Sequence, residues 1–222
     1  MLAVIPARAG SRGIPHKNMV DLCGKPLIQW TLDAVYGSLY VDRIVVTTDD
    51  PQVRKLALDQ GLDVIDRPPE IADDAASAAQ VIAHVLRQDP PEEVVLYLQP
   101  TSPLREAGDL DSALELLVAS SAEGIVAVTV VSEHPEWMYR IGANDFLLNP
   151  VLTTPRANRR QDLPKSVRLN GAIYCAPAEL LRPDGDIFRL RLAGYEMPRE
   201  RSVDIDFPSD LASVIRILDE RR

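Results

Sequence analysis

The chain of 222 residues is long enough for one substantial domain, which would bury about 70% of the surface that the unfolded chain exposes. Its hydrophobic fraction of 46% and charged fraction of 26% are ordinary for a globular protein, which argues against a disordered chain. The net charge of −9 argues against a nucleic-acid-binding protein, because such proteins carry a basic field.

The sequence lacks the features of membrane and metal-cluster proteins. No apolar run approaches the ~18 residues of a membrane span, and the first run is too short for a secretory signal. We therefore expect a cytoplasmic protein without a membrane partner. Cys23 and Cys175 have no metal-ligand spacing with each other or with the three histidines, so we expect both to be structural thiols.

Apolar runs rich in β-branched residues alternate with helical patterns along the first part of the chain. We predict strands at 2–5, 43–47, 62–65, 94–98 and 125–131, with helices between them at 26–36, 52–60, 75–87 and 110–119. This alternation is typical of βαβ units and predicts an α/β fold, with a largely parallel sheet covered by helices on both faces. Ligands of such sheets bind beyond the carboxyl ends of the strands.

The stretch IPARAGSRGIPHKN, residues 5–18, leaves the first predicted strand at such an end. Gly10 and Gly13 allow the backbone to turn tightly and to approach a ligand. Arg8, Arg12 and Lys17 can direct positive charge at an anion such as a triphosphate, although charges on a surface loop are often only solvated. The patterns GxxxxGK[ST] and GxGxxG are absent, which argues against a P-loop ATPase and a dehydrogenase.

The regular alternation stops in the segment 132–169, which contains several prolines and isolated aromatic residues. A long irregular segment is improbable inside a compact domain, so we expect either a lid or a protruding element that packs against another subunit. We favour a dimerisation arm, inserted into a single domain that spans residues 1–222.

After this segment we expect strands at 172–175 and 202–205 and a helix at 209–218. In a strand, residues two apart point to the same side, so Asp204 and Asp206 can present both carboxylates to one point. Mg²⁺ prefers hard oxygen ligands and needs one or two carboxylates when phosphates complete its shell. From spacing alone, the pair could instead cap the helix that begins near Ser209.

Two adjoining stretches carry a family resemblance. Residues 5–18, followed by Gly24-Lys25-Pro26-Leu27, resemble the signature of the acylneuraminate cytidylyltransferases, the CMP-sialic acid synthetase family. Further segments are similar to that family in the same order: 47–50, 67–70 with Ser77, 99–105, 160–164, 170–174 and 203–206. The resemblance implies a three-layer, Rossmann-like fold of the nucleotide-diphospho-sugar transferase type.

The resemblance also implies roles for individual residues. The implied nucleotide contacts are Ala7, Arg8, Gly10, Ser11, Arg12, Lys17, Asn18, Arg67 and Ser77. The implied sugar contacts are Gln99, Arg160, Arg168 and Tyr174. The implied ligands of Mg²⁺, with Mn²⁺ as an alternative ion, are Asp204 and Asp206. The residues expected to act in catalysis are Arg8, Arg12, Lys17 and Asp206.

Simpler interpretations of several of these residues stay open. Arg67 could be a loop charge and Ser77 part of a helix surface. Tyr174 could fill the core instead of contacting a sugar. An arginine fork matches a carboxylate, so Arg160 and Arg168 could bind the sugar acid or form salt bridges at a subunit interface.

The reaction implied by the resemblance is CTP + acylneuraminate → CMP-acylneuraminate + diphosphate, carried out by a homodimer. A legionaminic or pseudaminic acid is an alternative sugar, and the eight-carbon acid Kdo is a less favoured one. A protein of another class, a regulatory nucleotide-binding protein without turnover, is the remaining alternative. Retention of both aspartates together with Lys17 argues against that alternative.

Overall fold

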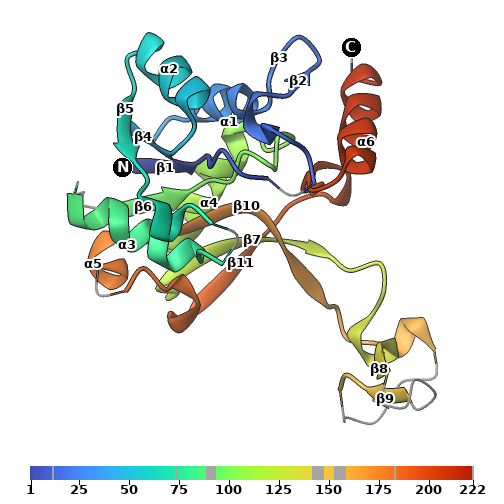
Figure 1. The fold of residues 1–222 in the computed structure, drawn as a ribbon. Helices are drawn as coiled ribbons and strands as arrows, with labels where there is room; N and C mark the ends of the chain where they lie inside the picture. Colours follow the sequence, from blue (N-terminus) through green and yellow to red (C-terminus); the bar gives the residue numbers. More distant parts are fainter. Residues whose placement is uncertain are drawn as a thin grey trace.

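A computed structural model describes residues 1–11, 13–73, 75–88, 94–141, 148–152, 159–182 and 184–221. Its centre is a 7-stranded sheet in the order β11-β7-β10-β6-β1-β4-β5 (Figure 1). The strands are β1 (Leu2–Pro6), β4 (Arg43–Thr48), β5 (Asp63–Asp66), β6 (Val94–Tyr97), β7 (Gly124–Val130), β10 (Val167–Pro177) and β11 (Leu192–Glu196). Only β10 pairs antiparallel with its neighbours in this sheet, so the predicted, mostly parallel α/β fold is confirmed.

Helices cover both faces of the sheet. They are α1 (Leu27–Tyr36), α2 (Pro51–Asp59), α3 (Ala78–Gln88), α4 (Ala107–Ala119), α5 (Ala178–Leu181) and α6 (Pro208–Asp219). The alternation of side chains along β1 shows how the layers form. Ala3 and Ile5 pack in a cluster with α1, α2 and α4, whereas Leu2 and Val4 pack in a cluster with α3 and α5. The result is the expected three-layer arrangement.

Short elements complete the description. They are η1 (Lys17–Met19), β2 (Asp21–Leu22), β3 (Lys25–Pro26), η2 (Pro69–Ile71), η3 (Pro135–Trp137), β8 (Tyr139–Ile141), β9 (Leu148–Pro150), η4 (Arg160–Asp162), η5 (Ile187–Arg189) and η6 (Arg199–Arg201). No helix in the described ranges is long and apolar enough to cross a membrane.

The strand predicted at 202–205 is wrong. This segment is an irregular connection between η6 and α6, and β11 supplies the edge strand that the sequence did not indicate. The backbone N–H of Ile205 donates to the carbonyl of Thr101, at 2.8 Å, in the loop after β6. The N–H of Ile205 therefore bonds to a loop and not to a neighbouring strand. Ile205 is apolar because its side chain is buried, and not because it belongs to the sheet.

Helix α6 packs outside the two faces of the sheet and against the opening loop. Its residues Val214 and Leu218 share a third apolar cluster with Ile14 of the opening loop and with Ile205. Ile205 is fully buried in this cluster. The packing therefore fixes the segment that carries Asp204 and Asp206 beside the opening loop.

The described residues of the predicted insertion 132–169 that precede β10 protrude from the body, and the antiparallel ribbon β8–β9 lies at their far end (Figure 1). Residues 167–169 belong to β10 and pair with β7, so the predicted insertion extends too far at its end. His134 fixes its base, since its Nε2 lies 3.0 Å from the carbonyl of Pro164 and 2.7 Å from Oγ of Ser166. Residues 142–147 and 153–158 of the insertion lie outside the described ranges. The role of the arm in dimerisation stays a prediction.

Candidate active site

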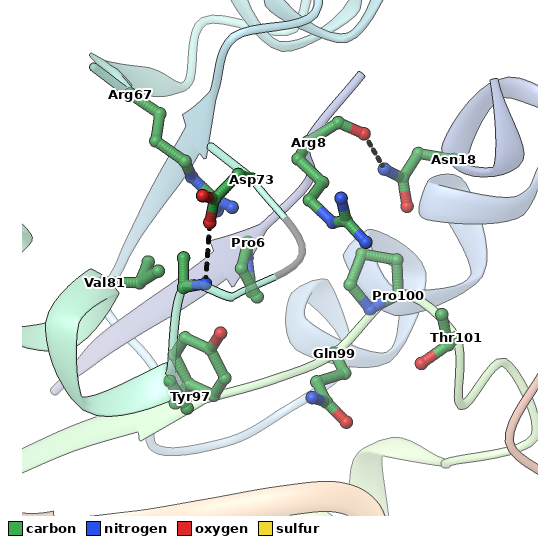
Figure 2. A pocket seen from close by; sticks show the side chains of 12 residues that line it. Pro6, Arg8, Asn18, Arg67, Asp73, Val81, Tyr97, Gln99, Pro100 and Thr101 are labelled. Carbon is green, nitrogen blue, oxygen red and sulfur yellow. Dashed lines mark hydrogen bonds between the residues drawn. The ribbon is translucent and has the colours of Figure 1, made fainter. Parts of the chain in front are cut away.

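A pocket opens at the carboxyl ends of β1 and β6, where the topology of the sheet leads us to expect a ligand (Figure 2). The opening loop forms one side, and the segments that follow β5 and β6 form the others. Its lining consists of Pro6, Arg8, Asn18, Arg67, Asp73, Ala76, Ala78, Val81, Tyr97, Gln99, Pro100 and Thr101. Arg8 and Arg67 give it two cationic side chains (Figure 2).

Hydrogen bonds hold the start of the opening loop against β4 and η1. The N–H of Ala7 donates to the carbonyl of Thr47 at 3.0 Å, and the hydroxyl of Thr48 donates to the carbonyl of Ala7. Nδ2 of Asn18 donates to the carbonyl of Arg8 at 3.1 Å (Figure 2). These bonds fix the backbone of Arg8, so its side chain is directed into the pocket.

The two loop glycines differ in what surrounds them. A Cβ on Gly13 would lie 1.9 Å from the carbonyl oxygen of Asp206, whereas a Cβ on Gly10 would meet only Nη1 of Arg8, at 3.7 Å. Gly13 therefore permits the close approach of the opening loop to the Asp206 backbone, which no other residue would allow. Gly10 and Ser11 do not line the pocket, and Arg12 lies outside the described residues.

Lys17 connects the opening loop to the aspartate pair, although the two segments are far apart in the sequence. Its Nζ donates to the carbonyl of Ile205 at 2.7 Å and to Oδ1 of Asp206 at 3.0 Å. The Lys17 side chain is mostly buried, while that of Asp206 is mostly exposed. The structure thus places a cation and a carboxylate from the predicted site in direct contact.

Asp204 has the character of a metal ligand. Its Oδ1 is buried and has no hydrogen-bond partner among the residues that the structure describes. Burial raises the pKa of Asp204, the negative charge of Asp206 adds to this, and a hydrogen bond with Thr101 and the cations Lys17 and Arg168 oppose it. An unpaired carboxylate oxygen next to a second carboxylate suits a hard cation such as Mg²⁺.

The two carboxylates do not lie on a strand, contrary to the prediction, although the charge of Asp206 acts on Asp204. They differ in exposure, and Ile205 between them is anchored in the third apolar cluster. Among the described residues, no group of three or more His, Cys, Asp or Glu side chains could hold a metal ion. A pair of carboxylates fits an ion whose remaining ligands come from substrate phosphates and water.

Arg67 forms a buried wall of the pocket. It is 7% exposed, and its Nη2 donates to the carbonyl of Thr47 at 3.0 Å, while its Nε has no hydrogen-bond partner within the described ranges. Burial lowers the pKa of Arg67, and the neighbouring Arg8 lowers it further. Tyr97 also lines the pocket, and burial raises the pKa of its phenol to about 12, so it stays a neutral hydroxyl.

Ser77 does not reach the pocket. It is exposed and precedes α3: its Oγ accepts from the N–H of Gln80 at 3.2 Å, and its own N–H donates to Oε1 of Gln80 at 2.8 Å. This reciprocal pair is a capping box, which explains why the helix begins later than the predicted residue 75. Asp73 and Ala76, which were not predicted, line the pocket instead.

A bulge in β10 lies next to Gln99 and Asp204. The pairing of β10 with β7 shifts register between Leu169 and Tyr174, and Gly171 within the bulge has φ +79°. A Cβ on Gly171 would lie 2.6 Å from Oε1 of Gln99 and 3.3 Å from Oδ2 of Asp204. The bulge therefore brings Gln99 and Asp204, predicted sugar and metal residues, to one place.

The other predicted sugar residues have different surroundings. Arg168 is exposed, its Nη2 donates to the carbonyl of Ser202 at 3.3 Å, and its charge acts on Asp204. Tyr174 packs edge-on between Tyr97 and Phe188, so it supports the wall of the pocket. Arg160 begins η4 in the arm, and its side chain lies outside the described part of the structure.

Comparison with known proteins finds relatives along nearly the whole chain. The family described as cytidylyltransferase matches residues 2–220. An N-acylneuraminate cytidylyltransferase of Streptococcus agalactiae is 32% identical over 216 residues, which are 96% of this chain and 52% of the relative. A CMP-N,N'-diacetyllegionaminic acid synthase of Legionella pneumophila is 32% identical over 225 residues, which are 99% of this chain and 96% of the relative.

The chain spans about half the length of several curated relatives, including the streptococcal one. Among solved structures, a CMP:2-keto-3-deoxy-manno-octonic acid synthetase complexed with CTP superimposes with a TM-score of 0.72. The two chains are 18% identical, and the alignment covers 100% of this chain and 99% of that synthetase, so it shows a shared fold. The chain belongs to the cytidylyltransferase family, as the resemblance of its motifs predicted.

Proposed function

We propose that the protein transfers the cytidylyl group of CTP to a sialic-type nine-carbon α-keto acid sugar, and releases diphosphate. The observation that carries this proposal is the junction between the cationic pocket and the aspartate pair. Thr101 lines the pocket and accepts the backbone hydrogen bond of Ile205, and Lys17 contacts Asp206. A nucleotide in the pocket would have its phosphates directed at this junction.

In the proposed reaction the anomeric hydroxyl of the sugar attacks the α-phosphorus of CTP. A new P–O bond forms as the bond to the diphosphate leaving group breaks. Such transfers depend mostly on positioning and on neutralising charge on the phosphate oxygens. Arg8 and Lys17, with Arg12 from the same loop, would supply that positive charge, and Arg67 would hold the nucleoside part.

Asp204 and Asp206 would hold Mg²⁺, or alternatively Mn²⁺. The buried, unpaired Oδ1 of Asp204 and the exposed carboxylate of Asp206 support this assignment. When bound, such an ion neutralises phosphate charge and promotes loss of the proton from a hydroxyl group. In the same site the Arg168 guanidinium, already close enough to act on Asp204, would pair with the carboxylate of the sugar acid.

The arm would mediate a homodimer. Its described residues expose a run of large apolar side chains: Trp137, Met138, Tyr139, Ile141, Leu148, Val151 and Leu152. An exposed patch of this kind is typical of a protein-protein contact. In a dimer built on these residues, Arg160 of the arm would lie close to the subunit contact and could serve the sugar site from there.

A legionaminic acid is a second candidate sugar, because the Legionella relative matches nearly the whole length of both chains. Diphosphate release with CTP, Mg²⁺ and a panel of nine-carbon and eight-carbon sugar acids distinguishes the candidates. We expect release with CTP and at least one nine-carbon acid, and none with ATP, GTP or UTP. Absence of release with every acid would contradict the proposal and favour a regulatory protein that binds nucleotide without turnover.

A further inference from the structure

Arg105 is a buried cation directly beneath the candidate sugar side of the site. It ends the stretch 99–105 that follows β6 and is 3% exposed. In the described part of the chain, no carboxylate lies within ion-pair distance of its guanidinium. Burial lowers the pKa of Arg105 to about 10, and the charge of Asp109 only partly opposes this. Burying a guanidinium without a carboxylate partner is costly, so stability alone does not explain its presence.

The hydrogen bonds of Arg105 join three separate elements. Its Nη1 donates to the carbonyl of Ala172 at 2.6 Å and to the carbonyl of Gln99 at 3.3 Å. Its Nη2 donates to Oγ1 of Thr31 in α1 at 2.7 Å. The two carbonyls belong to the loop after β6 and to the bulge of β10. Nη1 of Arg105 therefore connects the loop after β6 to the bulge of β10, close to Gln99 and Asp204.

The space between Gly171 in the bulge and the side chains of Gln99 and Asp204 is small. Gly171 precedes Ala172, and a Cβ on it would be 2.6 Å from Oε1 of Gln99 and 3.3 Å from Oδ2 of Asp204. A shift of the bulge relative to the loop would therefore change the position of the Gln99 amide relative to Asp204. Gln99 also lines the nucleotide pocket, but the sides of that pocket formed by the opening loop and by Arg67 are held by other bonds, those of Ala7, Asn18 and Arg67 with their neighbours.

We propose that Arg105 is a positioning residue, which holds the loop after β6 and the bulge of β10 at a fixed separation and so sets the geometry of the sugar subsite. The inference rests on the proposed function for the identity of the substrate. Arg105 does not touch the substrate. It acts through its hydrogen bonds to the Gln99 and Ala172 carbonyls. Its hydrogen bond to Thr31 of α1 holds the guanidinium in place.

The first test separates the sugar subsite from the nucleotide pocket. Arg105→Met removes the charge and both bridging bonds but keeps an unbranched side chain. A displacement of about 1 Å can cost about 100-fold in rate, so we expect kcat/KM for the sugar acid to fall by about that factor. The Kd for CTP, measured without sugar, should change by a much smaller factor, because Arg105 bonds to only one side of the nucleotide pocket, the loop after β6. An equal loss of CTP affinity, or an unchanged kcat/KM, would overturn the proposal.

Two further variants serve as comparisons. Arg105→Lys keeps the charge and should restore part of kcat/KM, and it is measured in place of Arg105→Met if that variant does not fold. Leu181→Ala removes a buried side chain from α5, at the far end of β10 from the bulge. It should lower Tm without changing the ratio between sugar and CTP affinities. A change of that ratio in Leu181→Ala would show that destabilisation alone produces the effect.

Amide hydrogen exchange tests the positioning role without any turnover. The N–H of Ser102 donates to the carbonyl of Gln99, and the N–H of Ala172 donates to Oδ1 of Asn170. In Arg105→Met both amides should exchange faster, while the amide of Ala7, which precedes the pocket residue Arg8, should not. Unchanged exchange at Ser102 and Ala172 would refute the role of Arg105, whichever sugar reacts. Failure of the wild-type protein to react with any sugar acid would instead refute the proposed function.

Discussion

At the scale of single residues, a substitution of Asp206 should impair turnover without lowering stability. Its side chain is 62% exposed, and its main contact is Lys17, so the fold does not depend on it. Asp206→Asn should lower kcat by a factor of about 10²–10³, since one electrostatic contact in a site of this kind typically contributes that much. Its Tm should stay close to that of the wild type. An Asp206→Asn protein with normal turnover would remove Asp206 from the metal site.

Gly13 and Gly10 form a matched pair in the opening loop. A Cβ at position 13 would collide with the carbonyl of Asp206, while one at position 10 would make an ordinary contact. Gly13→Ala should therefore lower the free energy of unfolding by about 1–3 kcal/mol, the usual cost of overpacking, and impair turnover. Gly10→Ala should do neither. Chemical denaturation of the two variants checks this, and equal losses in both would contradict the described geometry.

At the scale of secondary-structure elements, a buried ion pair anchors the segment that leads to the aspartates. Asp109 of α4 is 2% exposed, and Arg201 of η6 donates to both of its carboxylate oxygens. Tyr195 of β11 donates to Oδ1 of Asp109 at 3.0 Å. The network ties the end of the sheet to the segment just before Asp204.

Arg201→Met would leave the Asp109 carboxylate buried without a cationic partner. Breaking a buried pair in this way typically costs about 3–5 kcal/mol in the free energy of unfolding. Lys55→Ala is the control, because its pair with Asp59 on α2 is exposed on both sides and should contribute less than about 1 kcal/mol. Similar, small losses in both variants on urea denaturation would show that the Asp109 network does not anchor η6.

The sequence pattern predicted most elements because their burial is simple. Strands β1, β4, β6 and β7 are almost continuous apolar runs, as expected for strands covered on both faces. The pattern failed at 202–205, where one fully buried apolar residue, Ile205, packs against α6 and not in the sheet. It also missed β11, a half-exposed edge strand with a weak apolar pattern.

At the scale of the whole molecule, the site depends on contacts between distant segments, which no local pattern contains. The sequence could indicate Arg8, Lys17, Asp204 and Asp206 through their motifs. It could not show that Lys17 meets Asp206, because this contact depends on the packing of α6 against the opening loop. Nor could it show that the bulge of β10 brings Gly171 to Gln99, or that Arg105 lies beneath them.

The arm gives a prediction about assembly. Ile141 and Leu148 face each other across β8 and β9 and are 68% and 61% exposed. Replacing both with Asp should dissociate the expected homodimer, because charges at the centre of an interface are strongly unfavourable. Leu39→Asp, at a still more exposed position before β4, is the control. Sedimentation of a wild-type monomer, or of an undissociated double variant, would contradict the role of the arm.

The central claim is the joining of CMP to a sialic-type sugar acid. The most direct measurement is ³¹P nuclear magnetic resonance of a reaction that contains the protein, CTP, Mg²⁺ and a nine-carbon α-keto acid sugar. The predicted result is one new phosphodiester signal from the CMP-sugar, which grows in equal proportion to diphosphate while the three signals of CTP decline. Unchanged CTP with every such acid, or hydrolysis of CTP without a phosphodiester product, would contradict the claim.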